Sequence, residues 1–343
     1  MFSACTLSQV EFDVPSEIGF AVAANNMTKA AVAGSTLSSD VHLMVFAETS
    51  ENTSESADYL SNAEFKLKGN NLWGGWKNNA AYPYYWPNER TLHFAGYTKS
   101  GNVTLDNTSY NCQTGVLTIS NYSPGTSGAN DLMWFPSTEL TNAKGYGKTE
   151  GTVPVNLYHT CSWITFMVVG DDVTGSSSND FKVTSMTMLG VDHTADLTCR
   201  ATNSGGKIVP TIQWSKNTDQ TGENTTYSVA VKNRGTQIMT NPLNVETGEA
   251  DSKVGNVVLI PQKPGKLNLV YTYTNPAGTL VTDHVSGLEL AISTNEGENF
   301  WNPGRHYIYT IEIRADKVIV VPTLTETWGK VDGDHDLSQN QTN

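Results

Sequence analysis

Two short motifs in this sequence could bind phosphate or calcium, and both fail when their spacing is checked. Residues 145–149 read Gly-Tyr-Gly-Lys-Thr, but Asn142 stands where a phosphate-binding loop needs its first glycine, and a strand-like run follows instead of a helix. Residues 332–336 resemble the start of a calcium loop, but Leu337 replaces the turn glycine and Asn343 the bidentate glutamate. We therefore expect a surface turn and a solvated acidic tail.

Catalytic patterns are also missing. The seven histidines are scattered without an HExxH motif, and no GxSxG elbow occurs. His93 and His159 lie in alternating strand-like runs, where we expect structural side chains with satisfied hydrogen bonds. A glycosidase pair of carboxylates follows no local spacing rule, and nothing in the sequence supports one. We predict no enzyme activity, no catalytic residue, no metal and no cofactor.

Two residues near the start of the chain are suited to covalent processing. Cys5 follows Phe-Ser-Ala, which resembles the last positions of a bacterial lipoprotein signal, with Phe2 in place of the usual Leu. The basic start and apolar core of such a signal are missing. An ordinary unmodified cysteine is the alternative. Lys29 is the sole Lys or Arg in the first 65 residues, so a trypsin-like protease would find one site there, between Lys29 and Ala30.

The remaining cysteines do not form a metal or redox motif. Cys112, Cys161 and Cys199 show no CxxC pair and no histidine at metal-ligand spacing. If Cys5 is acylated, three cysteines remain. This odd number argues against a full disulfide framework, but the sequence allows one disulfide bond among the three. Cys161 sits inside an apolar strand-like segment and is expected to be a buried thiol.

Composition excludes several classes of function. The net charge of −13 and the isoelectric point near 4.9 argue against binding to nucleic acid or to anionic membranes. Only 16% of residues are charged, while Thr, Ser, Asn and Gly are abundant, as in secreted β-rich proteins. No apolar run approaches the roughly 18 residues that a membrane-spanning helix needs. The 343 residues fit two domains of about 150 residues each.

Short alternating runs recur along the whole chain and predict an all-β sandwich architecture. Helical periodicity is nearly absent, and its best candidate is the short segment 54–60. A polar stretch at 170–180 predicts a boundary between sandwiches at 30–170 and 171–328, preceded by a removable segment 1–29 and followed by a flexible tail 329–343. The predicted strands are 10–14, 18–22, 41–46, 91–97, 115–119, 153–157, 163–169, 181–189, 207–214, 227–232, 257–261, 266–273, 288–292, 306–314 and 317–324.

Aromatic residues crowd the segment from 73 to 87. Exposed rings at Trp76, Tyr84, Tyr85 and Trp86 could stack on sugars and bind glycans. The alternative is that they anchor the core, since large aromatic side chains bury about 150–250 Å² each. We favour the core, because Trp86 leads directly into the apolar run 92–97.

In combination, several motifs give this chain a family resemblance. It resembles the fimbrillins, the type V pilin and fimbrillin-like lipoproteins of Bacteroidales. It departs from them in its truncated signal, in Lys29 where many relatives have Arg, and in Thr-Cys-Ser at 160–162 where Ala-Leu-Ser is usual. The resemblance spans most of the chain and rests on Trp76, the YYWP at 84–87, LHFAGY at 92–97, DLM at 131–133, VPVNLYHTCSWITF at 153–166, LIPQ at 259–262 and WNPGRHYIYTI at 301–311.

The resemblance implies two transthyretin-like β-sandwich domains in tandem, exported as a lipoprotein. The precursor would be anchored to the outer membrane through lipid (palmitate) on Cys5, and a trypsin-like protease would cut after Lys29 and remove the N-terminal strand. A neighbouring pilin subunit, of the same or a related kind, would then donate its C-terminal strand, residues 317–328, to the open groove. The resulting cell-surface fimbria would support adhesion to host or bacterial ligands.

The residues of this C-terminal segment suit a donor strand. Val318, Val320, Leu324 and Trp328 share one parity and would contribute roughly 6–12 kcal/mol on burial, before ordering costs. Pro322 removes one ladder hydrogen bond, which an edge or a bend tolerates. Two alternatives stay open: the segment completes its own sandwich, or the protein is a surface lipoprotein that binds glycans and never polymerises.

Overall fold

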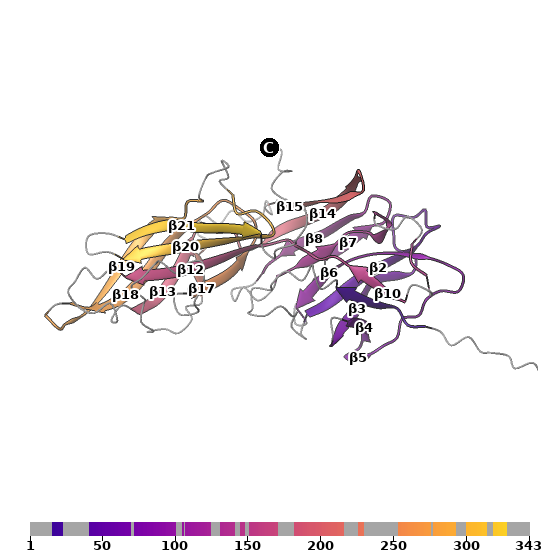
Figure 1. Ribbon diagram of the computed structural model, residues 1–343, viewed down its shortest axis with the longest axis horizontal. Helices are drawn as coiled ribbons and strands as arrows, with labels where there is room; N and C mark the ends of the chain where they lie inside the picture. The colour runs from indigo at the N-terminus through magenta and orange to yellow at the C-terminus, as the bar shows by residue number, and fades with distance from the viewer. Residues whose placement is uncertain are drawn as a thin grey trace, which may run out of the picture.

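A computed structural model of the chain shows an all-β protein with two lobes (Figure 1). In the described part of the chain, the one helical element is a 3-10 turn, Thr138–Leu140, and no helix there is long and apolar enough to cross a membrane. The structure describes residues 16–22, 41–69, 72–100, 105, 107–124, 131–140, 145–147, 151–170, 182–215, 226–229, 253–275, 277–292, 300–313 and 318–327.

The first lobe is built on one large curled sheet with strand order β10-β1-β4-β3-β2-β6-β9-β11, to which β5 adds beside β4. Side chains from both halves of this sheet meet in a first core that contains Phe20, Phe65, Phe94 and Phe135. Strands far apart in the sheet order therefore face each other. The strands are β1 (Gly19–Val22), β2 (Val41–Thr49), β3 (Leu60–Gly69), β4 (Leu72–Lys77), β5 (Ala80–Ala81), β6 (Leu92–Ser100), β9 (Met133–Phe135), β10 (Thr152–Val155) and β11 (Tyr158–His159).

A smaller sheet, β15-β14-β8-β7, covers the opposite face of the large sheet. Side chains of β2 and β6 alternate between the two faces, so Val45 points into the first core and Met44 into a second core. The second core also holds Trp134, Cys161 and Cys199. The strands of this sheet are β7 (Thr108–Asn111), β8 (Val116–Tyr122), β14 (Ala195–Ser204) and β15 (Lys207–Ser215).

The second lobe is a β-sandwich of two four-stranded sheets, β17-β12-β20-β21 and β16-β13-β18-β19. A third core fills it, with Phe166, Trp301, Tyr307 and Tyr309 as its large fully buried rings. The strands are β12 (Ser162–Gly170), β13 (Lys182–Leu189), β16 (Thr226–Val229), β17 (Lys253–Leu259), β18 (Lys266–Thr274), β19 (Leu280–Glu289), β20 (Arg305–Ile313) and β21 (Val318–Thr327).

No single point in the sequence separates the strands of the first lobe from those of the second. β12, which precedes the predicted boundary at 170–180, pairs with β17 and β20 of the second lobe. The hairpin of β14 and β15, which follows that boundary, pairs with β8 of the first lobe. The chain therefore crosses between the lobes more than once (Figure 1).

A joint between the lobes forms around residues 160–163. The indole of Trp163 stacks on His306 with ring centroids 3.6 Å apart, and the indole N–H of Trp214 donates to the carbonyl of Thr160 at 2.7 Å. The backbone N–H of Gly304 donates to the carbonyl of Cys161 at 2.8 Å. The bond from Trp214 of β15 and the packing of Trp163 against the second core tie the start of β12 to the first lobe.

The helix candidate at 54–60 was wrong. Leu60 begins β3, and the residues before it form turns. The side chain of Asn52 accepts the backbone N–H of Ser54 at 2.9 Å, and the Ser54 hydroxyl accepts that of Ser56 at 3.2 Å. Such side-chain bonds to nearby backbone groups compete with helix formation.

Candidate functional site

The first described strand lies inside the large sheet, paired on both sides. β1 runs antiparallel to β4 and parallel to β10. In this register Phe20 stands opposite Trp73 on one side and Val153 on the other. The backbone of β1 is therefore hydrogen-bonded to a strand on each side. We call the place that β1 fills between β4 and β10 the β1 slot.

β1 also contributes the centre of the first core. Ile18 and Phe20 are 1% and 0% exposed. The ring of Phe20 makes edge-on contacts with Phe65 and Phe94, with centroids 4.9 and 5.2 Å apart, and a tilted contact with Phe135 at 6.4 Å. Each such aromatic pair adds about 0.5–1.5 kcal/mol to the stabilisation from burial alone. The β1 slot therefore includes an aromatic pocket.

Residues 82–86 form a strap across the residues that lead into β1. The backbone N–H of Ile18 donates to the carbonyl of Tyr84 at 2.7 Å, and that of Trp86 donates to the carbonyl of Ser16 at 3.1 Å. Glu17 and Tyr85 form the antiparallel bridge between these bonds. The strap thus extends the backbone pairing of the β1 slot beyond β4.

The strap is held from two directions. The backbone N–H of Tyr82 donates to the carbonyl of Gly75 at 2.9 Å, and a Cβ at Gly75 would lie only 2.0 Å from the Tyr82 carbonyl oxygen. The hydroxyl of Tyr59 donates to the carbonyl of Tyr85. Glycine at 75 is thus required by the close approach of the strap.

The predicted glycan-stacking residues are divided between core and surface. Trp86 is 4% exposed and meets Phe94 edge-on at 5.7 Å, so it belongs to the first core. Tyr84 is half-buried against Phe65. Tyr85 is 43% exposed, and Trp76 is half-buried with the Lys66 ammonium 4.6 Å from its ring centroid.

The predicted donor segment forms the edge strand β21 of its own lobe. It pairs antiparallel with β20, and the register shifts where Ile308 faces Leu324 and Tyr309 faces Pro322. Pro322 therefore lies at an edge, as strand geometry requires. Val318 and Val320 are half-buried against the third core. Trp328 lies outside the described residues, as do the processing residues Cys5, Lys29 and Ala30.

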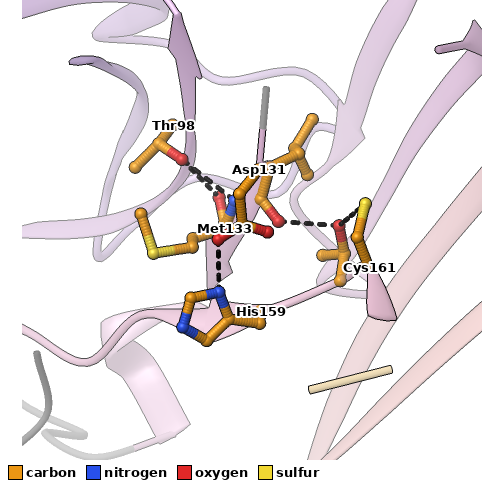
Figure 2. Close-up of polar contacts among 7 residues, drawn as sticks. Thr98, Asp131, Met133, His159 and Cys161 are labelled. Carbon is orange, nitrogen blue, oxygen red and sulfur yellow. Dashed lines mark hydrogen bonds and ion pairs between the residues drawn. The ribbon is translucent and has the colours of Figure 1, made fainter. Parts of the chain in front are cut away.

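A buried polar cluster joins residues 131–133 to the strands around them (Figure 2). The imidazole of His159 is paired with the carboxylate of Asp131, and both side chains are almost wholly buried. The backbone N–H of Met133 donates to the Thr98 hydroxyl at 2.9 Å, and the Thr160 hydroxyl donates to the carbonyl of Leu132 at 2.7 Å. The expected structural role of His159 fits these contacts.

The three described cysteines are free, buried thiols. Burial raises the pKa of Cys112, Cys161 and Cys199, so each stays protonated and is a poor nucleophile. His93 is buried too, with its Nε2 3.1 Å from the Ser50 hydroxyl, and burial lowers its pKa. Across the described residues, no group of three or more His, Cys, Asp or Glu could hold a metal ion.

Sequence reasoning found the strand at 18–22 but missed the Phe20 pocket and the strap. The pocket is made by β3, β6 and β9, and the strap by a loop more than sixty residues beyond Ser16. Each of these contacts is long-range. The strand pattern around Phe20 indicates only that its side chain is buried.

Comparison with known proteins matches this chain to one family. The family described as fimbrillin-like matches residues 28–328. A candidate cell adhesion protein from Bacteroides uniformis shares the fold at a TM-score of 0.52 and 14% identity, covering 92% of this chain and 98% of that one. A fimbrial protein from Bacteroides vulgatus shares the fold at a TM-score of 0.51 and 16% identity, covering 91% of this chain and 99% of that one. No curated protein sequence matches.

Proposed function

The chain belongs to the fimbrillin-like family, and from this we propose that it is a structural subunit, a stalk or tip pilin, of a cell-surface fimbria that supports adhesion. We infer that its two lobes are transthyretin-like sandwiches in tandem. The observation that carries the proposal is the position of β1, which pairs on both sides and places Phe20 at the centre of the first core. Loss of such a strand would leave two unpaired edges beside an apolar pocket.

In the proposed maturation, a trypsin-like protease cuts between Lys29 and Ala30. The removed segment comprises residues 1–29 and so carries both β1 and the lipid anchor on Cys5. The precursor is then held at the outer membrane, and the mature subunit is free to enter the fimbria. The maturation requires no catalytic residue, metal or cofactor of the subunit itself.

The proposed donor is residues 317–328 of a neighbouring pilin subunit. Its described part, β21, pairs with β20 alone, so it can leave by breaking a single ladder. Adding a strand to a vacant edge gains main-chain hydrogen bonds, while its alternate side chains fill the pockets. Val318, Val320, Leu324 and Trp328 are the side chains proposed to enter the slot.

Limited trypsin treatment of the purified full chain tests this proposal. We expect one early cut after Lys29, followed by fibres visible by electron microscopy and by a shift to high mass in gel filtration. Lys29→Gln is the matched control and should resist the early cut and stay monomeric. A cut chain that stays monomeric and also binds no strand peptide in place of the removed segment would overturn the proposal.

A second candidate function is glycan binding by a subunit that does not polymerise. Its support is the exposure of Tyr82 and Tyr85, 44% and 43%, near the half-exposed Trp76. Rings with one open face can stack on sugars. Glycan-array binding that is lost in Trp76→Ala, with unchanged thermal unfolding, would favour this function, whereas binding that survives Trp76→Ala and Tyr85→Ala would exclude these rings as the site.

A further inference from the structure

We propose that the β1 slot selects an incoming strand with an aromatic side chain at the place of Phe20, and therefore prefers a strand of another subunit type over this chain's own β21. The inference rests on the proposed function in one respect, namely that β1 is replaced. It follows from the backbone contacts of the strap and from the shape of the aromatic pocket.

The backbone contacts define where an occupant must lie. Pairing begins with the carbonyl of Ser16 and the N–H of Ile18, both bound by the strap, and continues through Val22 beside β4 and β10. An occupant that reproduces these bonds is extended over the same length and has no proline at the place of Ile18, because proline lacks the N–H. This fixes the register of the strand.

The aromatic pocket defines which side chain the occupant needs at the place of Phe20, two residues after the place of Ile18. The rings of Phe65, Phe94 and Phe135 surround Phe20, which is fully buried. Protein interiors are close-packed, so a smaller side chain leaves a void whose lining loses its contacts. Valine or leucine in this pocket would leave three aromatic rings without their central partner.

β21 of this chain does not meet both requirements. No aromatic residue occurs from Val318 to Thr327, so an alignment of Val318 with Ile18 puts Val320 into the aromatic pocket. Alignment of Trp328 with Phe20 instead puts Glu326 at the buried place of Ile18, or Lys330 if the strand runs in the opposite direction. A buried charge without a partner is strongly unfavourable. The fitting occupant is a strand with an aliphatic residue followed, two positions on, by an aromatic one.

A strand graft in the intact, uncleaved chain tests the pocket. One variant carries the β21 residues in place of β1, as Ile18→Val, Gly19→Ile, Phe20→Val and Ala21→Val, and the matched control carries the same changes but keeps Phe20. We expect the first variant to lose about tenfold or more of its hydrogen-exchange protection at 16–22 and 82–86, and the control to keep it. Equal protection in the two variants would overturn the proposal.

Peptide binding to the trypsin-cut protein tests the same preference between molecules. One peptide has the sequence of residues 318–328, and the other has that sequence with Val320→Phe. We expect the second peptide to bind about tenfold more tightly, whereas equal affinity would contradict the proposal. If trypsin fails to release residues 1–29, the proposed maturation is wrong, while the graft still decides what the pocket prefers.

Discussion

At the residue scale, Asp131 and His159 form a polar contact in the first lobe whose two side chains are almost wholly buried. Removing one partner leaves the other group buried without its hydrogen bond, at a cost of about 1–3 kcal/mol. We expect Asp131→Leu and His159→Leu each to lower the free energy of unfolding by such an amount in urea titrations. The double variant should cost less than the sum of the two, and strict additivity would show that the pair is not coupled.

His93 should make stability depend on pH. Its pKa in the folded protein is lowered by burial, so below about pH 6.5 the unfolded chain binds a proton more readily than the folded one. The free energy of unfolding should therefore fall as the pH decreases from 6.5 through the lowered pKa. His93→Gln should flatten this part of the profile. A profile unaffected by His93→Gln would refute the assignment.

Residue roles that depend on local pattern could be predicted, and those that depend on distant partners could not. The buried thiol of Cys161 and the core position of Trp86 follow from the apolar segments around them, and the structure confirms that both are buried. His159 is paired as expected, whereas Nδ1 of the buried His93 has no hydrogen-bond partner among the described residues. The central place of Phe20 does not follow, because its partners come from three strands elsewhere in the chain. Alternation predicts that a side chain is buried but not which side chains it meets.

At the scale of elements, the strap depends on Gly75. A Cβ at this position would press on the backbone carbonyl of Tyr82, and moving Tyr82 away would strain the bond that its own N–H donates to the Gly75 carbonyl. We expect Gly75→Ala to lower the free energy of unfolding by about 1–3 kcal/mol and to reduce hydrogen-exchange protection at 82–86. Gly19→Ala is the control, since its Cβ would meet only the Trp73 carbonyl at 3.5 Å. Equal effects of the two changes would show that the strap is not closely held.

Most strands could be located from alternation, and the misses have physical reasons. β3 was missed because Ser54 and its neighbours suggested a helix, although Ala63, Phe65 and Leu67 alternate. β14 ends in exposed polar residues, and β19 has exposed or half-buried side chains along its whole length, so the apolar pattern of both strands is weak. The order of strands within the sheets depends on pairing between distant segments, such as β1 with β10, and no local pattern indicates it.

At the scale of the whole molecule, the joint at residues 160–163 should couple the two lobes. Trp163 stacks on His306, and the second core that it packs against includes Val258 from β17. We expect Trp163→Ala to lower the free energy of unfolding by up to about 3 kcal/mol and to separate the unfolding midpoints of the two lobes. Hydrogen exchange at β2 in the first lobe and at β18 in the second measures the two midpoints. Trp76→Ala should leave the midpoints together. A shared midpoint in Trp163→Ala would show that the lobes are coupled by other contacts.

The parallel and antiparallel neighbours of β1 have a mechanical consequence. Whichever strand fills the β1 slot is bonded along its length on both sides, so a force along the strand axis loads many hydrogen bonds together instead of peeling them one by one. A linkage of this geometry withstands shear far better than it withstands peeling. If subunits join through this slot as proposed, the joint would resist tension along the strand axis without any covalent cross-link.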